Sequence, residues 1–311
     1  MKKIILIGSS GYIGKKIHEE ILRRKIGCLP LRGIDVLDAS GAVLEKAVCD
    51  YTPDFVFCAA GYTGKPNVDA CEYHKAECMA GNAVLPGIVK QVCDRNSLKW
   101  GHISSGCIFT GNTDEGSGFT ETDPPNFSFR QDNCSFYSGC KALGEEALGY
   151  GCKIQNGKSA WVSDGLETGY VWRIRIPFEA GNNPRNYISK VMAYKKLLDA
   201  ENSITDLGEA VPVMVDMAVS DAATGIYNVT QPGSVTTRQL VGWIQESPLG
   251  ATLTKQGKEF MFFSSDEDFY RTAAQAPRSN CVLDTSKIQK AGFGLRPVEI
   301  AVRECLEKWT N

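Results

Sequence analysis

The chain has 311 residues, of which 43% are hydrophobic and 23% are charged, with a formal net charge of −2 and a pI near 6.0. This length suits one large domain, or a main domain with a smaller appendage. The near-neutral charge gives no electrostatic reason to expect a nucleic acid or a membrane surface as partner. The composition is that of an ordinary soluble globular protein.

The twelve cysteines show neither paired C-x-x-C spacing nor the density of a small disulfide scaffold, and there are only three histidines. No metal site is therefore expected. At the N-terminus a basic pair precedes only four apolar residues before glycine appears, which is too short for a signal peptide or a membrane span. These features favour a reducing, cytoplasmic location.

Apolar runs and helical spacing alternate along the first half of the chain. Buried strands are predicted at 2–8, 28–31, 54–60, 98–104 and 170–177, and helices at 12–26, 41–48, 69–94 and 136–150. This alternation predicts an α/β fold of Rossmann type, with a doubly wound parallel sheet. Functional groups should then gather beyond the carboxyl ends of the strands.

Two segments interrupt this alternation. Residues 111–135 are rich in Gly, Asn, Asp, Pro and Ser, which predicts a long loop over the strand ends. Residues 151–168 are polar and are interpreted as a surface excursion.

The second half has weaker periodicity. It predicts a helix over 183–198, a strand and turn over 225–233, and a helix over 236–246 with Thr236 or Thr237 as N-cap. We expect a dinucleotide-binding domain over 1–175, to which some later segments return, and a smaller, mainly substrate-binding lobe over 176–311.

A G-x-x-G-x-x-G pattern follows the first strand at Gly8, Gly11 and Gly14. Such glycines let a pyrophosphate approach the backbone at a helix N-terminus, although the same pattern also forms tight turns without a ligand. We expect this turn, with Ser10, Tyr12 and Ile13, to bind the cofactor. Arg32 ends the second strand and favours the 2′-phosphate of NADP(H), while nearby Asp35 and Asp38 leave NAD(H) possible.

Tyr137 and Lys141 stand at Y-x-x-x-K spacing, one helical turn apart. A lysine cation near a phenol lowers the phenol's pKa, which would suit Tyr137 to exchange a proton with a carbinol oxygen. With the glycine turn and Ser105, this pair resembles the extended short-chain dehydrogenase/reductase family. The resemblance implies a Ser–Tyr–Lys catalytic set and a cofactor lining that includes Cys58, Ala59, Ala60, Tyr62, Asn82, Tyr137 and Lys141.

Eight sequence blocks narrow the resemblance further. In chain order they are AAGYTGKPNVDACE, SSGCIF, GSGFTETDPPNF, SFYSGCKA, RIRIP, NPRNYISK, GIYNVTQPG and APRSN. They look like the plant-type nucleotide-rhamnose synthase/epimerase-reductases, which are relatives of dTDP-4-dehydrorhamnose reductase. The chain departs from that pattern at 151–168, a change expected to touch no motif, and at Ser104 and Ser105, where threonine is more usual.

The resemblance implies that Cys107 and Lys190 are the acid/base groups of an epimerisation. From the residues alone, Cys107 is more often a packing residue and Lys190 more often a solvated charge. Arg278 is a candidate for the substrate diphosphate or a brace of the lobe. Weaker candidates for substrate contacts are Arg185, Asn186, Lys65 and Asn67.

The expected function is NADPH-dependent reduction of a nucleotide-linked 4-keto-6-deoxyhexose, with 3,5-epimerisation, which yields a UDP- or dTDP-rhamnose-type sugar. The partners expected are the nucleotide-sugar substrate and a second copy of the chain in a homodimer. One alternative is an epimerase or dehydratase that keeps NAD bound, and another is a non-catalytic subunit on the same fold.

Overall fold

The centre of the molecule is a six-stranded sheet in the order β12-β7-β4-β3-β1-β2, and every neighbouring pair is parallel. The computed structural model describes residues 2–38, 40–164 and 168–310. The strands are β1 (Lys3–Ile7), β2 (Gly27–Leu31), β3 (Phe55–Cys58), β4 (Lys99–Ser105), β7 (Gly169–Ile174) and β12 (Gly225–Asn228). The strand order changes direction between β1 and β3, which is the switch point of a doubly wound fold. The predicted fold class is confirmed.

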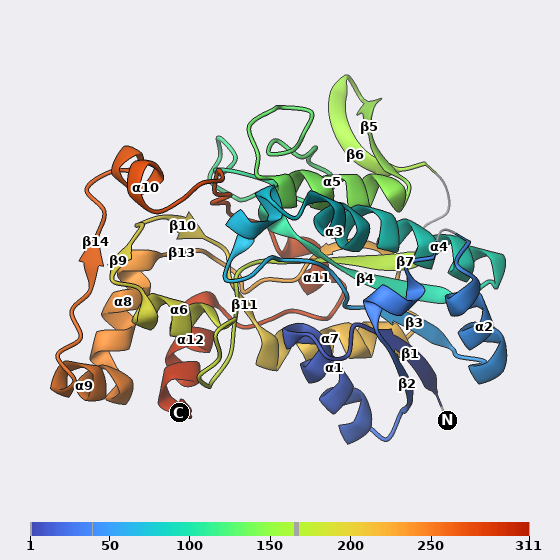
Figure 1. Ribbon diagram of the computed structural model, residues 1–311, viewed down its shortest axis with the longest axis horizontal. Coiled ribbons are helices and arrows are strands. Elements are labelled where there is room, and N and C mark those ends of the chain that lie inside the picture. The colour runs from blue at the N-terminus through green and yellow to red at the C-terminus, as the bar shows by residue number, and fades with distance from the viewer. Residues whose placement is uncertain (1, 39, 165–167, 311) are drawn as a thin grey trace.

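Helices cover both faces of this sheet (Figure 1). Ile4 and Leu6 of β1 pack toward one layer, and Ile5 and Ile7 pack toward the other. Because both faces are buried, the strand reads as a continuous apolar run. The first layer contains α1 (Tyr12–Arg23), α7 (Leu207–Val219) and α11 (Ser286–Lys290), and the second contains α2 (Ala42–Tyr51), α4 (Leu85–Arg95) and α5 (Phe136–Ala147).

The single helix predicted over 69–94 is wrong, because the segment is broken into four pieces. They are a 3₁₀ turn η2 (Val68–Glu72), α3 (Lys75–Met79), a π turn η3 (Ala80–Val84) and α4. Pro86 lies in the first turn of α4 and has no N–H to donate to the carbonyl of Asn82. The regular helical hydrogen bonding is therefore interrupted around Asn82, and a π turn forms there. Such π turns are common next to functional groups.

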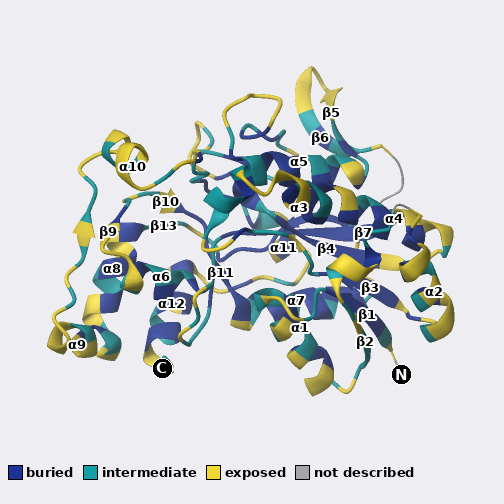
Figure 2. Ribbon diagram, in the orientation of Figure 1, coloured by how far each residue is buried: buried dark blue, intermediate teal, exposed yellow. Residues whose placement is uncertain are grey.

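A smaller lobe with its own apolar core lies beside the sheet (Figure 2). Its helices are α6 (Tyr187–Ala193), α8 (Thr237–Glu246), α9 (Pro248–Lys255), α10 (Asp266–Thr272) and α12 (Val298–Glu307). Its short strands pair as β8 (Pro177–Phe178) with β11 (Thr205–Asp206), β9 (Lys196–Leu197) with β14 (Met261–Phe262), and β10 (Glu201–Asn202) with β13 (Val235–Thr236).

Two predictions in this lobe have different outcomes. Thr236 caps α8 with a full capping box, as its sequence position predicts. The helix predicted over 183–198 is too long. The helix α6 begins after its N-cap Asn186 and ends at Ala193, and residues 196–197 instead pair with β14.

The polar segment after α5 forms a hairpin of β5 (Tyr150–Gln155) and β6 (Lys158–Ser163), and residues 165–167 lie outside the described residues. The hairpin is an excursion from the sheet, but it touches a motif-bearing helix. Trp161 is buried and its indole N–H donates to Glu145 of α5 at 3.1 Å. Glu145 lies outside the SFYSGCKA block, so the segment alters no motif but contacts the helix that carries one.

Glu145 also forms a fully buried ion pair with Arg173 of β7, through bonds of 2.9 and 2.7 Å. Ser104 of β4 donates to the same carboxylate at 2.7 Å. One carboxylate thus joins two strands, the hairpin and α5. Removing one partner of a buried pair leaves an uncompensated charge in the interior.

We predict that Glu145→Gln lowers the free energy of unfolding by about 3–5 kcal/mol, because Arg173 loses its counter-charge without a change in side-chain volume. Urea unfolding of the ligand-free chain measures this loss. Glu146→Gln is the matched control, since Glu146 pairs with the exposed Arg130 at 2.9 Å and its loss should stay below about 1 kcal/mol. Equal losses in the two variants would contradict the role of the buried pair.

Candidate active site

The glycine turn between β1 and α1 leaves no room for a side chain at Gly8 or Gly14. A Cβ on Gly14 would lie 2.0 Å from the carbonyl oxygen of Gly8, and one on Gly8 would lie 2.6 Å from the Ala60 nitrogen. Gly8 also has a φ of 88°, which favours glycine. Gly11 caps α1 without any side-chain bond to the first turn. The turn therefore fits the pyrophosphate of a dinucleotide.

Arg32 lies directly after β2 and next to this turn, since the Gly8 N–H donates to the Leu31 carbonyl at 2.8 Å. Its guanidinium is exposed and pairs with Asp35 through bonds of 2.8 and 2.9 Å. The position agrees with a role at the adenosine ribose, and the bidentate pair holds the guanidinium in place.

The segment after β3 forms the next wall of the site. Asn82 is fully buried; its amide donates to the Tyr62 carbonyl at 2.7 Å and its oxygen accepts the Tyr62 N–H at 3.3 Å. A Cβ built on Gly61 would lie 3.0 Å from the Asn82 oxygen and 3.6 Å from the Lys141 nitrogen. Asn82 and Lys141 thus meet beside the backbone that follows Cys58, Ala59 and Ala60.

Ser105, Tyr137 and Lys141 come together at the end of β4. Ser105 is the last residue of the strand, and Tyr137 is the second residue of α5, whose N-cap is Ser135. Lys141 lies one turn further and its ammonium donates to the Ile103 carbonyl of β4 at 3.1 Å. This bond holds the catalytic face of α5 against the strand that carries Ser105.

The electrostatics of this trio differ from the sequence expectation. Burial raises the pKa of Tyr137 well above its usual range, while a hydrogen bond with Ser105 opposes the shift. Burial also lowers the pKa of Lys141. The predicted lowering of the phenol's pKa by Lys141 is wrong here, because desolvation of the phenol dominates. The phenol is therefore a neutral proton donor.

Cys107 lies two residues beyond Ser105, in the 3₁₀ turn η4 (Gly106–Ile108). It is 4% exposed, and its N–H donates to the Ser105 hydroxyl at 3.2 Å. Burial raises the pKa of its thiol, and hydrogen bonding to Ser105 and the nearby charge of Arg175 oppose that shift. Tyr137 packs against the same apolar cluster, so the thiol and the phenol are close neighbours.

Lys190 lies on α6, and its environment lowers its pKa, whereas that of Cys107 raises the pKa of the thiol. Burial and the positive charge of Arg185 lower the pKa of Lys190, which favours the neutral amine. Arg185 itself reaches from the lobe to the segment after β3, where it contacts the Thr63 hydroxyl and donates to the Gly64 carbonyl at 3.2 Å. These contacts bring the Lys190 helix to the junction of the lobe with the sheet domain.

The other proposed substrate residues have structural contacts of their own. Arg278 makes a bidentate pair with Asp69 at 2.6 and 2.7 Å, which favours its alternative role as a brace. Asn186 is fully buried and holds the Glu179 and Gly181 carbonyls at 2.8 and 2.7 Å. Asn67 caps η2 by accepting the Asp69 N–H at 2.9 Å, and Lys65 is exposed on the same loop.

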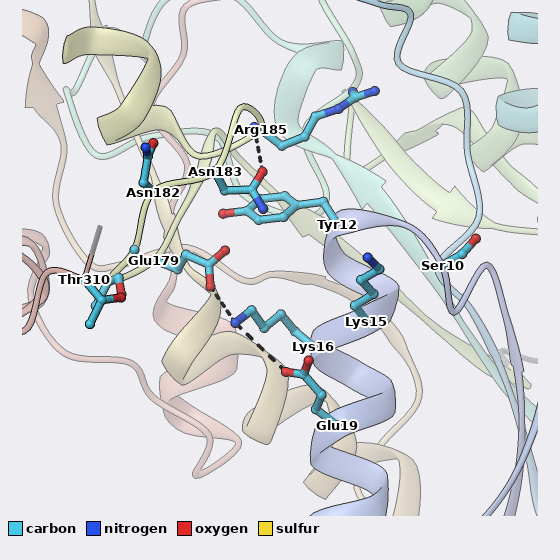
Figure 3. A pocket seen from close by; sticks show the side chains of 12 residues that line it. Ser10, Tyr12, Lys15, Lys16, Glu19, Glu179, Asn182, Asn183, Arg185 and Thr310 are labelled. Atoms are coloured by element: carbon cyan, nitrogen blue, oxygen red, sulfur yellow. Dashed lines mark hydrogen bonds and ion pairs between the residues drawn. The ribbon is translucent and has the colours of Figure 1, made fainter. Parts of the chain in front are cut away.

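A cavity of about 500 Å³ opens between the start of α1 and the loop after β8 (Figure 3). Ser10, Tyr12 and Arg185 line it together with Glu179, which pairs with Lys16 at 2.6 Å. Figure 3 shows the Tyr12 ring beside Asn183, so this predicted cofactor residue also faces the lobe. The cavity does not include Ser105, Cys107 or Tyr137, and it belongs to the edge of the site rather than to the reacting centre.

Sequence reasoning missed three features around this site. Glu145, which anchors α5, stands four residues after Lys141, and that spacing places it on the same helical face. No such spacing in the sequence indicates where Arg175 lies relative to Cys107. Cys71, Cys78 and Cys140 form a buried cluster against Tyr137 and Tyr62, and Asn82 donates to the Cys78 sulfur at 3.4 Å.

Comparisons with known proteins agree with this geometry. The chain matches the model of the RmlD substrate binding domain over residues 1–311. It is 33% identical to the bifunctional dTDP-4-dehydrorhamnose 3,5-epimerase/dTDP-4-dehydrorhamnose reductase of Arabidopsis thaliana, over 98% of this chain and 91% of that protein. A trifunctional UDP-glucose 4,6-dehydratase/UDP-4-keto-6-deoxy-D-glucose 3,5-epimerase/UDP-4-keto-L-rhamnose-reductase of the same plant is 30% identical, and the chain spans 41% of its length.

Solved structures show the same fold. The L780 UDP-rhamnose synthase of Acanthamoeba polyphaga mimivirus superposes with a TM-score of 0.83 at 24% identity, over 99% of this chain and 100% of that one. The dTDP-4-dehydrorhamnose reductase of Bacillus anthracis in complex with NADP gives 0.71 at 16% identity, over 98% and 97%.

Among the described residues, no helix combines the length and the apolar character that crossing a membrane requires.

The full-length family match and the bifunctional relative confirm the resemblance seen in the sequence blocks. The chain belongs to the RmlD substrate-binding domain family, whose matched relatives are enzymes of nucleotide-rhamnose synthesis.

Proposed function

We propose that this protein uses NADPH to reduce a nucleotide-linked 4-keto-6-deoxyhexose and also epimerises it at carbons 3 and 5, giving a UDP- or dTDP-rhamnose-type sugar. The observation that carries the proposal is the convergence of Ser105, Tyr137, Lys141 and Cys107 at the carboxyl end of β4. The bifunctional plant relative, matched over nearly its full length, supports the same pair of activities.

The cofactor would bind along the glycine turn, with Arg32 near its adenosine ribose and Asn82 and Lys141 on the inner wall. When bound, it supplies a hydride to carbon 4 of the sugar. Tyr137 donates the proton that the resulting carbinol oxygen needs, since burial keeps its phenol protonated. Ser105 and Tyr137 hydrogen-bond the same oxygen while it carries negative charge.

Epimerisation needs a base on one side of the carbon and an acid on the other. The opposite pKa shifts support Lys190, whose pKa is lowered, as the base and Cys107, whose pKa is raised, as the acid. Lys190 removes the proton next to the ketone, and the enolate oxygen is held by Ser105 and Tyr137. Cys107 then returns a proton to the other face, which inverts the centre.

Tyr137→Phe should lower kcat for ketone reduction by roughly 10²–10⁴-fold, because the proton donor is lost. The decrease of NADPH absorbance with UDP- or dTDP-4-keto-6-deoxyglucose measures this rate. NADPH binding, followed by fluorescence, should be nearly unchanged. A variant within tenfold of the parent would remove Tyr137 from the mechanism.

Cys107→Ser should slow solvent deuterium uptake at carbons 3 and 5 by at least about a hundredfold, while a pre-epimerised ketone is still reduced within about fivefold of the parent rate. NMR of the products separates the two reactions. Cys281→Ser is the matched control, because Cys281 is a buried thiol of the same cluster and its sulfur donates to the Gly106 carbonyl at 3.1 Å. Equal loss of both reactions in Cys107→Ser would refute the division of labour.

Arg32→Ala should weaken NADPH binding about tenfold and leave NADH binding within about twofold, because a guanidinium binds the 2′-phosphate and not a free hydroxyl. Fluorescence titration with each nucleotide gives the two dissociation constants. If both change by the same factor, Arg32 does not select the cofactor.

A further inference from the structure

Arg175, directly after β7, is a buried cation with no acidic partner among the described residues. It is 8% exposed, and no carboxylate of the described chain lies within ion-pair distance of its guanidinium. Its terminal nitrogen donates to the Asn202 amide oxygen at 2.7 Å and contacts the Ser279 carbonyl. Its Nε is buried and has no hydrogen-bond partner.

Arg175 differs from Arg173, two residues earlier, in how its charge is compensated. Arg173 is neutralised by Glu145, whereas Arg175 is held by neutral groups only. A buried charge without a counter-charge is costly, by several kcal/mol in typical proteins. Such a residue is explained if a negative charge develops beside it during function.

The fold places this guanidinium next to Cys107. The β4–β7 register aligns Ser105 with Ile174, so Arg175 lies opposite the turn that starts at Gly106. The Ser279 residue that contacts Arg175 also donates to the Phe109 carbonyl at 2.6 Å, which ties the two segments together. The positive charge of Arg175 acts on the Cys107 thiol and opposes the effect of burial on it.

The other ionisable groups near Arg175 keep their protons. Cys281 donates its S–H to the Gly106 carbonyl at 3.1 Å. The Tyr187 hydroxyl shares a hydrogen bond of 3.3 Å with Thr237, and burial raises the pKa of its phenol. Cys107 is the group near this guanidinium that the proposed epimerisation requires to give up its proton.

We propose that Arg175 is a positioning residue whose guanidinium stabilises the thiolate that Cys107 becomes when it gives its proton to the sugar carbon. This inference rests on the proposed epimerase function. In that step the S–H bond breaks and its electron pair stays on sulfur, while the enolate double bond supplies the pair for the new C–H bond. The ketone re-forms, and the proton taken earlier remains on Lys190.

Several polar and ionisable groups surround Cys107 and affect its ionisation. From β4, α5, the end of β7, η2 and the two flanking loops they are Ser105, Tyr137, Ser138, Lys141, Arg175, Cys71, Cys134 and Cys281. Among them only Lys141 and Arg175 are cationic, and Lys141 is bonded to the Ile103 carbonyl.

The test is a thiolate titration without substrate. The absorbance of the parent chain at 240 nm, minus that of Cys107→Ser, is followed against pH, and the same difference is taken in the Arg175→Met and Arg175→Lys backgrounds. Loss of the cation should reduce the Cys107 thiolate about tenfold at a given pH, and Arg175→Lys should restore most of it. Arg130→Met, which removes an exposed cation, should change nothing.

An unchanged Cys107 titration in Arg175→Met overturns the inference, even if the chain epimerises its substrate. A shifted titration in a chain that takes up no deuterium from solvent would show that Arg175 stabilises the Cys107 thiolate and would refute the proposed function. If Arg175→Met does not fold, the Arg175→Lys comparison decides, because a lysine that keeps the charge should hold the parent titration. A tenfold loss of thiolate in folded Arg175→Lys would contradict the electrostatic role.

Discussion

The buried pair of Glu145 and Arg173 is the interaction on which the geometry of the site depends. It links α5 to β7 at full burial, and Ser104 of β4 donates to the same carboxylate. Tyr137 and Lys141 are on the same helix as Glu145, about two turns and one turn before it, respectively. Through this pair the helix that carries the phenol and the ammonium is fixed above the strand that ends in Ser105.

The hairpin formed by β5 and β6 extends this arrangement. Its Trp161 donates to the second oxygen of Glu145, and the Trp161 N–H donates to the Thr122 carbonyl at 2.7 Å. A segment that is mostly exposed thus supplies one buried side chain to the support of the catalytic helix. With Arg173, Ser104 and Trp161 all donating, the carboxylate is well satisfied, as a buried charge requires.

Around the reacting centre, burial determines which groups hold protons. It raises the pKa of the acids Tyr137 and Cys107 and lowers the pKa of the bases Lys141 and Lys190. Both shifts have one cause, because removal of water disfavours whichever form is charged. Burial therefore favours the neutral phenol and the neutral thiol, while the charge of Arg175 opposes the effect of burial on Cys107.

The sequence by itself determined the sheet, the glycine turn and the Ser–Tyr–Lys set, because these depend on local patterns: apolar runs, glycine spacing and a helical turn between Tyr137 and Lys141. Tertiary structure decided which charges are compensated. Arg278 is paired by Asp69 from more than two hundred residues away, while Arg175 is left with neutral partners. The anchoring of Trp161 was likewise decided by contacts with residues from other segments. Such pairings depend on distances across the folded chain, and residue spacing along the sequence does not contain them.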